Sequence, residues 1–357
     1  AYAPYDDGDC PACYVAICAA RSLAGTKTIT AKTHHRIKGE IMTKIGFIGL
    51  GNVGAKLSGS LLRNGTDLMV RDLDKGAAAP LLAAGAVWAD SPKQMAELCD
   101  IIITCLPSPT ISAAVLEAED GLLAGFGPGK IWAEMSTTDE TEIHRLAALI
   151  AKTGGRSVDC PVSGGCHRAA TGNISIFAGC DRDVFDNMLP HLTKMGRRIL
   201  HTGPLGSATV LKVVTNYLAT ANLVSVSEAL STCAAAGMDL KTSYEAIKIS
   251  SGTSFVHETE SQVILNGSRD ISFTMDLVLK DVSLFADVAK RAGLSLEVAP
   301  LLVEIFKDGI ARYGEREFSP NIIRRIEEPA GLNIRADGFP ADIEDDEPEE
   351  PGYEVIL

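Results

Sequence analysis

The sequence predicts an α/β domain with a parallel sheet, followed by a second domain that is all helical. Between residues 44 and 205, short apolar runs alternate with segments whose apolar residues recur at helical spacing. The runs are almost continuously apolar, which is typical of parallel strands covered by helices on both faces. From Ser207 to about Arg316 the apolar spacing is helical nearly throughout. We therefore expect the first domain at residues 42–205 and the second at residues 206–328.

The first domain is expected to alternate strands and helices. A strand at residues 45–50 precedes a helix at 53–64, whose inward face would carry Val53, Leu57, Leu61 and Leu62. Further strands are expected at residues 67–72, 100–107, 130–136, 156–163 and 174–179, with a helix at about 139–153. The second domain would begin with one long helix from residue 207 to about 235.

Length and charge exclude several classes of protein. The 357 residues suffice for two domains, and 46% hydrophobic with 22% charged residues is typical of a globular protein. No apolar run approaches the ~18 residues that a membrane-spanning helix needs. The net charge of −13 argues against binding to nucleic acid or to an anionic membrane.

The two ends of the chain differ from the rest. Residues 331–357 hold nine acidic residues and one basic residue, hence −8 of the −13. We interpret residues 329–357 as a solvated acidic tail, too polar to join a core. Residues 1–41 are interpreted as a disordered leader or a non-native extension, with Met42 as the expected start. The acid-free stretch 21–38 favours a leader, and the aspartates at 6, 7 and 9 argue against one.

The nine cysteines are scattered, and several lie in apolar runs, as Cys105 does. Such placement favours reduced, buried thiols over disulfides. We therefore expect a cytoplasmic protein, or one of an organellar matrix if residues 1–41 are a leader. Cys10 and Cys13 form a lone CxxC pair with no second pair, so no metal site is predicted.

Three glycines, Gly49, Gly51 and Gly54, lie at G-x-G-x-x-G spacing between the first expected strand and helix. Gly49 would make a tight turn, Gly51 would let a pyrophosphate approach the backbone, and Gly54 would let strand and helix pack closely. Asp72 ends the next strand and could bind ribose hydroxyls while repelling a 2′-phosphate, which favours NAD over NADP. Arg71 could instead reach such a phosphate, and a plain tight turn is the alternative to a cofactor site.

Lys212 and Asn216 interrupt the apolar long helix at i and i+4, so they share one face. Burial lowers the pKa of a lysine towards neutrality, as proton transfer at pH 7 requires. The alternative is a lysine that extends its ammonium to solvent. In "DCPVSGG" (159–165), Ser163 precedes Gly164 and Gly165, whose bare N–H groups could hold a carboxylate, although an ordinary turn has the same pattern.

In this order, the motifs resemble those of the β-hydroxyacid dehydrogenases, which include 3-hydroxyisobutyrate dehydrogenase and tartronate semialdehyde reductase. The resemblance covers roughly residues 43–326 and implies a Rossmann-type dinucleotide-binding domain followed by an all-helical domain. "GFIGLGNVG" is similar to the cofactor motif, and "DCPVSGG" with "GNISIFAG" to the substrate motif. Gly206, Lys212 and Asn216 match the catalytic motif, and "LVLKDVSLFADVA" (277–289) is similar to the late Lys-Asp helix.

The resemblance implies a role for each matched residue. Lys212 would be the catalytic general acid/base; Ser163, Gly164, Gly165 and Asn216 would bind the substrate. The implied cofactor-binding residues are Gly49, Leu50, Gly51, Asn52, Val53, Gly54, Asp72, Leu106, Pro107, Ser136, Thr137 and Lys280. Cys160 and Cys180 stand where the family has Ala and Gly. His167 and Arg168 stand where residues vary with substrate, and we interpret them as solvated rather than as ligands.

The implied function is an NAD(P)-dependent oxidoreductase that interconverts a short 3-hydroxy acid and its semialdehyde. Alternatives are a tartronate or succinate semialdehyde reductase, or a non-catalytic dinucleotide-binding scaffold, against which the Lys212–Asn216 pair argues. The expected partners are a small carboxylic acid and further copies of the chain, as a homodimer or homotetramer. Association is expected because so apolar a long helix has more surface than one small helical domain covers.

Overall fold

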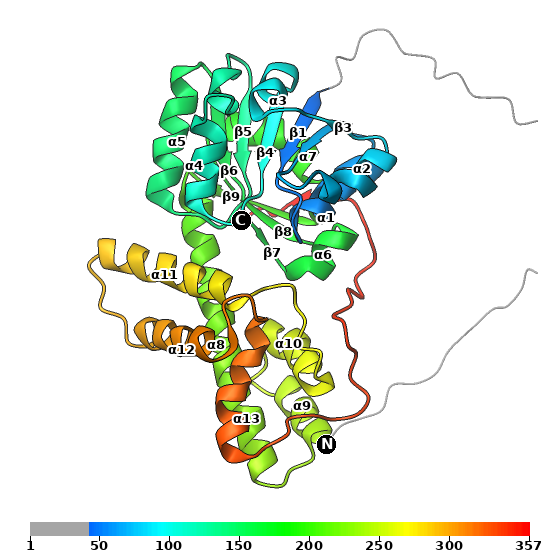
Figure 1. Cartoon of the computed structure of the whole chain (residues 1–357), viewed down its shortest axis with the longest axis vertical. Helices are drawn as coiled ribbons and strands as arrows, with labels where there is room; N and C mark the ends of the chain where they lie inside the picture. Colours follow the sequence, from blue (N-terminus) through cyan, green and yellow to red (C-terminus); the bar gives the residue numbers. More distant parts are fainter. Residues whose placement is uncertain (1–42) are drawn as a thin grey trace, which may run out of the picture. The chain divides into compact units, whose positions relative to one another are not determined.

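The computed structural model describes residues 43–357. The expected leader, its Cys10–Cys13 pair and the expected start at Met42 lie outside these residues. The predicted fold class is confirmed, because an α/β domain that contains the sheet precedes a helical domain (Figure 1).

The first domain contains one ten-stranded sheet in the order β10-β9-β8-β6-β5-β4-β1-β2-β3, with β7 paired to β8 off this path. Neighbouring strands are parallel except where β8 meets β6 and β7. The strands are β1 (Lys44–Ile48), β2 (Asp67–Arg71), β3 (Val87–Trp88), β4 (Ile101–Thr104), β5 (Ile131–Glu134), β6 (Arg156–Asp159), β7 (Val162–Ser163), β8 (Ser175–Gly179), β9 (Arg198–Gly203) and β10 (Tyr353–Glu354). The strand order reverses between β1 and β4, where open α/β sheets bind ligands at the carboxyl ends of the strands.

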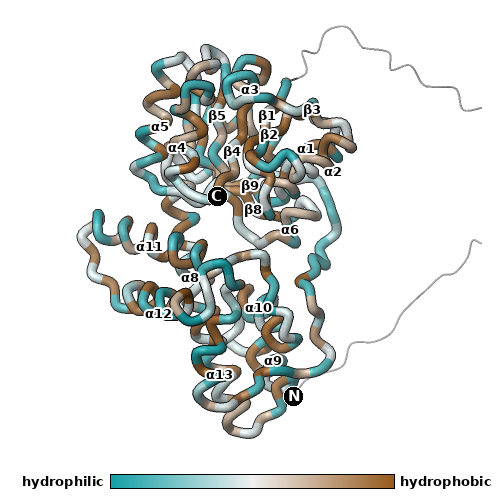
Figure 2. Tube along the Cα trace, viewed as in Figure 1, coloured by the Kyte–Doolittle hydropathy of each residue, from teal (hydrophilic) through white to brown (hydrophobic). Residues whose placement is uncertain are grey.

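Strand residues alternate between two hydrophobic clusters, one on each face of the sheet. In β1, Ile45 and Phe47 belong to one cluster and Ile48 to the other. Figure 2 shows hydrophobic residues along the central strands. The helices of this domain are α1 (Gly54–Arg63), η1 (Lys75–Ala78), α2 (Ala79–Ala83), α3 (Pro92–Leu98), α4 (Pro109–Glu117), η2 (Leu122–Ala124), α5 (Glu140–Lys152), α6 (Gly165–Thr171) and α7 (Arg182–Leu192).

The second domain is built on α8 (Ser207–Ala235), the long helix that the sequence predicts. α8 contacts β6, β8 and β9 of the sheet as well as α9 to α12, so it joins the two domains (Figure 1). The other helices are α9 (Leu240–Lys248), α10 (Phe255–Asn266), α11 (Met275–Arg291), α12 (Val298–Tyr313), η3 (Ser319–Ile323) and α13 (Arg324–Ala330). A separate core contains Leu230, Val278 and Phe306. Within residues 43–357, no helix combines the length and the apolar character needed to cross a membrane.

Three strands have no counterpart among the expected elements. β3 and β10 are two residues long, too short to show alternation in the sequence. In β9 the apolar pair Ile199 and Leu200 lies between Arg198 and His201, which hides the strand pattern. The single strand expected at 156–163 is divided at Pro161, which has no N–H to donate to a ladder.

The interpretation of residues 329–357 as a solvated tail is wrong. After α13 the chain returns to the first domain, drawn in orange to red in Figure 1, and ends as β10 beside β9. Its acidic residues meet arginines there: Glu347 pairs with Arg168 and Arg198, and Glu354 with Arg182. The net charge of this segment predicted exclusion from the fold, but these arginines give its acidic residues partners there.

Candidate active site

The loop between β1 and α1 has the geometry of a phosphate cradle. Gly49 has a φ of +97°, and a Cβ there would lie 2.2 Å from the carbonyl oxygen of Cys105. A Cβ on Gly54 would lie 2.0 Å from the carbonyl oxygen of Gly49. Glycine is therefore needed at both positions for β1, α1 and the loop between them to pack this closely. Around Gly51, by contrast, no atom lies within 4 Å of such a Cβ. These three environments fit a pyrophosphate beside Gly51 at the N-terminus of α1.

Asp72 lies directly after β2 and stabilises the same loop. Its Oδ2 accepts a hydrogen bond from the backbone N–H of Leu50 (2.6 Å), and its Oδ1 accepts one from Asp74 (2.9 Å). A carboxylate in this place retains lone pairs for ribose hydroxyls. The Arg71 guanidinium donates instead to the carbonyl oxygens of Ala89 (3.0 Å) and Asp90 (2.6 Å). These bonds hold Arg71 on the segment after β3, which weakens the case for a phosphate ligand.

Ser136 and Leu106 connect the carboxyl ends of β4 and β5. The N–H of Leu106 donates to Ser136 Oγ (2.7 Å), and the N–H and hydroxyl of Ser136 both donate to Glu134 Oε1. Burial raises the pKa of Glu134, which is 1% exposed. The sequence analysis assigns Glu134 no role, although it is the one charged residue of β5, and an acid in an apolar strand is the signal that could have revealed it. Its bonds fix Ser136, whose hydroxyl in turn holds the backbone of Leu106 beside Gly49.

Lys212 and Asn216 belong to a chain of polar contacts that crosses between the domains. Lys212 Nζ donates to Asn216 Oδ1 (2.7 Å), and Asn216 Nδ2 donates to Asp281 Oδ2 (2.5 Å). Lys280 Nζ donates to Asp281 Oδ1 (2.6 Å) and to the carbonyl oxygen of Thr137 (2.8 Å). The expected residues Lys212, Asn216, Thr137 and Lys280 are therefore brought together. Asp281, the aspartate of the Lys-Asp motif to which no role was assigned, links them.

The environment of Lys212 alters its acidity. Lys212 is 8% exposed, and burial lowers its pKa from 10.5 to about 8 against the opposing charge of Asp281. Asp281 is 1% exposed, pairs directly with Lys280 and is connected to Lys212 through Asn216. The alternative of a lysine reaching into solvent is wrong, and the ammonium at this site can lose its proton near neutral pH.

Asp159 connects the substrate motif to the helix that carries Lys212. Its two carboxylate oxygens accept the backbone N–H groups of Gly206 and Thr209, both at 2.7 Å. Asp159 is fully buried, and burial raises its pKa to about 6 although these two N–H groups favour the charged form. An aspartate here caps the first turn of α8 and so fixes its position relative to β6.

Ser163 ends β7, and the chain then turns through Gly164 (φ +130°) and Gly165 (φ +85°) into α6. Such φ values favour glycine, so the conformation of this turn depends on the two glycines. Within residues 43–357, no hydrogen bond joins Ser163 directly to Lys212. The connection is indirect: β7 pairs with β8, β8 pairs with β6 at Asp159, and Asp159 binds the N-terminus of α8. The interpretation of Arg168 as solvated is wrong, because it pairs with Glu347 (2.9 Å) and lies 5.0 Å from the Phe255 ring centre.

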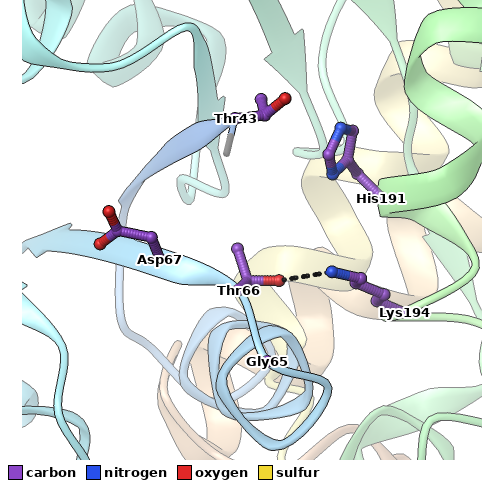
Figure 3. Close-up of a pocket in the computed structure, with 6 residues that line it drawn as sticks. All are labelled: Thr43, Gly65, Thr66, Asp67, His191 and Lys194. Carbon is purple, nitrogen blue, oxygen red and sulfur yellow. Dashed lines mark hydrogen bonds between the residues drawn. The ribbon is translucent and has the colours of Figure 1, made fainter. Parts of the chain in front are cut away.

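A small cavity of about 140 Å³ lies at the amino ends of β1 and β2, opposite to the carboxyl ends that carry the cofactor loop (Figure 3). It is lined by Thr43, Gly65, Thr66, Asp67, His191 and Lys194. Thr43 and Thr66 directly precede β1 and β2, whereas the cofactor loop follows the carboxyl ends of the strands. In Figure 3 the Lys194 ammonium points to the Thr66 hydroxyl, at 3.4 Å. This cavity is therefore separate from the candidate active site.

Comparison with known proteins agrees with this geometry. The family model described as "NAD binding domain of 6-phosphogluconate dehydrogenase" matches residues 44–203. The model described as "NAD-binding of NADP-dependent 3-hydroxyisobutyrate dehydrogenase" matches residues 206–326. Together they cover both domains and support an NAD(P) cofactor, but neither extends to the segment after α13.

Individual relatives span the same region. The 2-(hydroxymethyl)glutarate dehydrogenase of Eubacterium barkeri is 32% identical over 82% of this chain and 97% of that protein. The NAD-dependent L-serine dehydrogenase of Pseudomonas aeruginosa is 32% identical over 81% of this chain and 99% of that protein. The crystal structure of 3-hydroxyisobutyrate dehydrogenase from Salmonella typhimurium has a TM-score of 0.73 at 27% identity, covering 79% of this chain and 99% of that one. The resemblance seen in the sequence is confirmed: the chain belongs to the β-hydroxyacid dehydrogenases, a family of NAD(P)-dependent oxidoreductases.

Proposed function

We propose that this enzyme interconverts a short 3-hydroxy acid and its semialdehyde, with NAD as the preferred cofactor. The observation that carries the proposal is Lys212, a buried lysine whose pKa is lowered to about 8 and which is held by Asn216. The bound nicotinamide would supply the hydride chemistry. The protein would hold it with the loop at residues 49–54, Asp72, Leu106, Pro107, Ser136, Thr137 and Lys280.

Lys212 would exchange a proton with the substrate oxygen. In oxidation its neutral amine accepts the hydroxyl proton; in reduction its ammonium returns one to the carbonyl oxygen. Asn216 limits the rotation of the amine through the 2.7 Å bond, and Asp281 holds Asn216 from the other side. Proton transfer then needs no large side-chain movement at the moment of reaction.

Two relatives indicate the substrate class. Serine and 2-(hydroxymethyl)glutarate, which their names contain, both carry a hydroxymethyl group on the carbon next to a carboxylate. We infer that this chain takes substrates of the form HOCH₂–CHR–COO⁻. The carboxylate would bind at Ser163, Gly164 and Gly165, where the positive φ values of the two glycines make a turn whose successive backbone N–H groups would face the anion.

A substrate panel tests this function. Purified protein would be assayed for NADH and NADPH formation with 3-hydroxyisobutyrate, glycerate and serine, which have this form, and with threonate and 4-hydroxybutyrate, which do not. The reverse reaction would be assayed with semialdehydes. Lys212→Ala should reduce kcat by ~10²-fold or more while cofactor affinity persists, because it removes the proton acceptor. Near-normal turnover in that variant, or no turnover of any panel member by the unaltered protein, would contradict the proposal.

We also infer that the enzyme works in a reducing compartment. The six cysteines within residues 43–357 are free, and burial raises the pKa of Cys99 to about 11 and that of Cys105 to about 12. Such thiols stay protonated and unreactive at neutral pH. Alkylation after denaturation without reductant, followed by mass spectrometry, should label all six, and a disulfide between any two would contradict the inference.

A further inference from the structure

The segment after α13 has no part in the function proposed above, yet it contacts both domains. We call residues 336–354 the C-terminal strap. At its start, the N–H of Ala336 donates to the carbonyl oxygen of Leu265 (3.0 Å). Asn266 Nδ2 donates to the carbonyl oxygen of Phe339 (2.8 Å), so these bonds attach the strap to the end of α10.

The middle of the strap is hydrogen-bonded to the end of α6 and to Asn173 just after it. Asp345 Oδ2 accepts hydrogen bonds from the Thr171 hydroxyl and from Asn173 Nδ2 (2.7 Å). Asn173 Nδ2 also donates to the carbonyl oxygen of Glu347 (2.8 Å). The side chain of Asp345 is 2% exposed and Asn173 is fully buried, so water cannot readily replace these bonds. They differ from surface ion pairs, which contribute little to stability.

Arg168 connects the strap to the proposed substrate-binding turn at Gly164 and Gly165. Its guanidinium pairs with Glu347 (2.9 Å) and lies within 3.8 Å of Asp345. Its aliphatic stem lies under the turn, because a Cβ on Gly164 would be 3.2 Å from Arg168 Cδ. The guanidinium also lies over the ring of Phe255, the first residue of α10. Arg168 thus connects the strap, the substrate turn and the second domain.

The end of the strap is attached elsewhere. The N–H of Tyr353 donates to the carbonyl oxygen of Arg197 (2.9 Å), and β10 lies along β9. Glu350 pairs with Arg197, and Glu354 pairs with Arg182 (2.6 Å). These two acids carry the same charge as Asp345 and Glu347 but do not contact α6, which makes them matched controls.

We propose that the C-terminal strap positions the substrate-binding turn, acting through Asp345 and Glu347 on Arg168 and the end of α6. The strap would hold Gly164 and Gly165 in the conformation that receives the substrate carboxylate. This role rests on the proposed function, because it assigns the carboxylate to that turn. Asp345, Glu347 and Arg168 are positioning residues, and none of them is assigned to the proton or hydride step.

Steady-state kinetics separate this role from a merely structural one. In full-length protein, Asp345→Asn with Glu347→Gln should raise KM for the hydroxy acid by ~10-fold, with kcat and the KM for NAD within about twofold. Glu350→Gln with Glu354→Gln, which removes the same charge from the strap, should leave all three within about twofold. Glu347→Gln alone is the milder variant if the double one folds poorly, and circular dichroism checks the fold of each.

A mutant cycle tests the path through Arg168. If Glu347 acts through the guanidinium, adding Glu347→Gln to Arg168→Met should raise KM by less than about twofold more. A fully additive effect would show that Glu347 acts by another route, and would overturn the part of the proposal that assigns Arg168.

Hydrogen exchange gives a readout that needs no substrate. Backbone amides of residues 165–174 should exchange at least ~10-fold faster in the Asp345/Glu347 variant than in the Glu350/Glu354 variant. Unchanged exchange together with unchanged KM would overturn the proposal, as would equal effects from the control pair. If no hydroxy acid is turned over but the exchange still differs, the proposed function is contradicted, whereas the stabilisation of α6 by Asp345 and Glu347 is supported.

Discussion

Lys212 is buried in a helix that is apolar on most sides, and its neighbours determine its chemistry. Burial lowers its pKa to about 8, the charge of Asp281 opposes that change, and Asn216 fixes its position. Local spacing predicts the pair Lys212 and Asn216, because i and i+4 share a helix face. It cannot predict Asp281, which lies 65 residues beyond Asn216 and meets it only after folding.

The pKa of Lys212 predicts the pH dependence of turnover. For oxidation the amine must be neutral, so kcat should rise with pH to a plateau above about pH 8; for reduction it should fall through the same range. Asp281→Asn removes the charge that raises this pKa, so the midpoint should move to lower pH, with a lower plateau because Asn216 loses its support. Measurements of kcat from about pH 6 to about pH 10 check this. An unmoved midpoint in the variant would show that Lys212 is not the titrating group.

Asp72 predicts the cofactor preference. Asp72→Ala should raise KM for NAD by roughly tenfold and change KM for NADP less, because it removes a ribose ligand and a charge that repels the 2′-phosphate. Asp74→Ala is the control. Asp74 is also an acid of the segment after β2, but its carboxylate accepts a hydrogen bond from the N–H of Gly76 (2.8 Å) instead of holding Leu50. Since Asp72 also holds Leu50, some loss with both cofactors is expected. An unchanged ratio of the two KM values would contradict the preference for NAD.

Among the elements, α8 carries the proposed catalytic lysine and depends on a distant residue for its position. Its apolar spacing predicts the helix from residue 207 to about 235, as observed. The cap does not follow from local pattern, because Asp159 reaches Gly206 over 47 residues. The sequence likewise hides β9 and β10, since one has few apolar residues and the other has two residues in all. Periodicity thus predicts the long elements, whereas the contacts that fix them depend on tertiary structure.

Removing the cap of α8 should affect both stability and activity. Asp159→Ala leaves two N–H groups at the buried start of α8 without their acceptor, and the free energy of unfolding should fall by about 2–3 kcal/mol. Asp239→Ala, at the exposed N-terminus of α9, should cost only about 1 kcal/mol. Urea denaturation measures both, and kcat should fall only in the Asp159 variant because α8 carries Lys212. Equal losses in the two variants would show that Asp159 has no special role.

At the scale of the whole molecule, the sequence pattern predicts the change from an α/β to a helical region but not the position of the acidic end of the chain. The change from strand–helix alternation to helical spacing near residue 206 marks the change that the structure shows. The acidity of the last residues predicts a solvated tail, because the sequence does not reveal that Arg168, Arg182 and Arg198 each pair with an acid of this segment. Net charge describes a segment by itself, and its place in the fold depends on complementary charge elsewhere.

The surface of α8 leads to a prediction about assembly. Leu211 and Leu218, seven residues apart and so on one face, remain 40% and 54% exposed within residues 43–357. Large apolar side chains left on a long helix are typical of an interface between copies. We expect light scattering after gel filtration to give two or four times the 37.7 kDa chain mass, and Leu218→Glu to lower it to one. Ile249→Glu, which alters an 84% exposed residue after α9, should leave the assembly intact. A chain that is monomeric at every concentration would contradict the prediction, as would a Leu218→Glu variant with the unaltered mass.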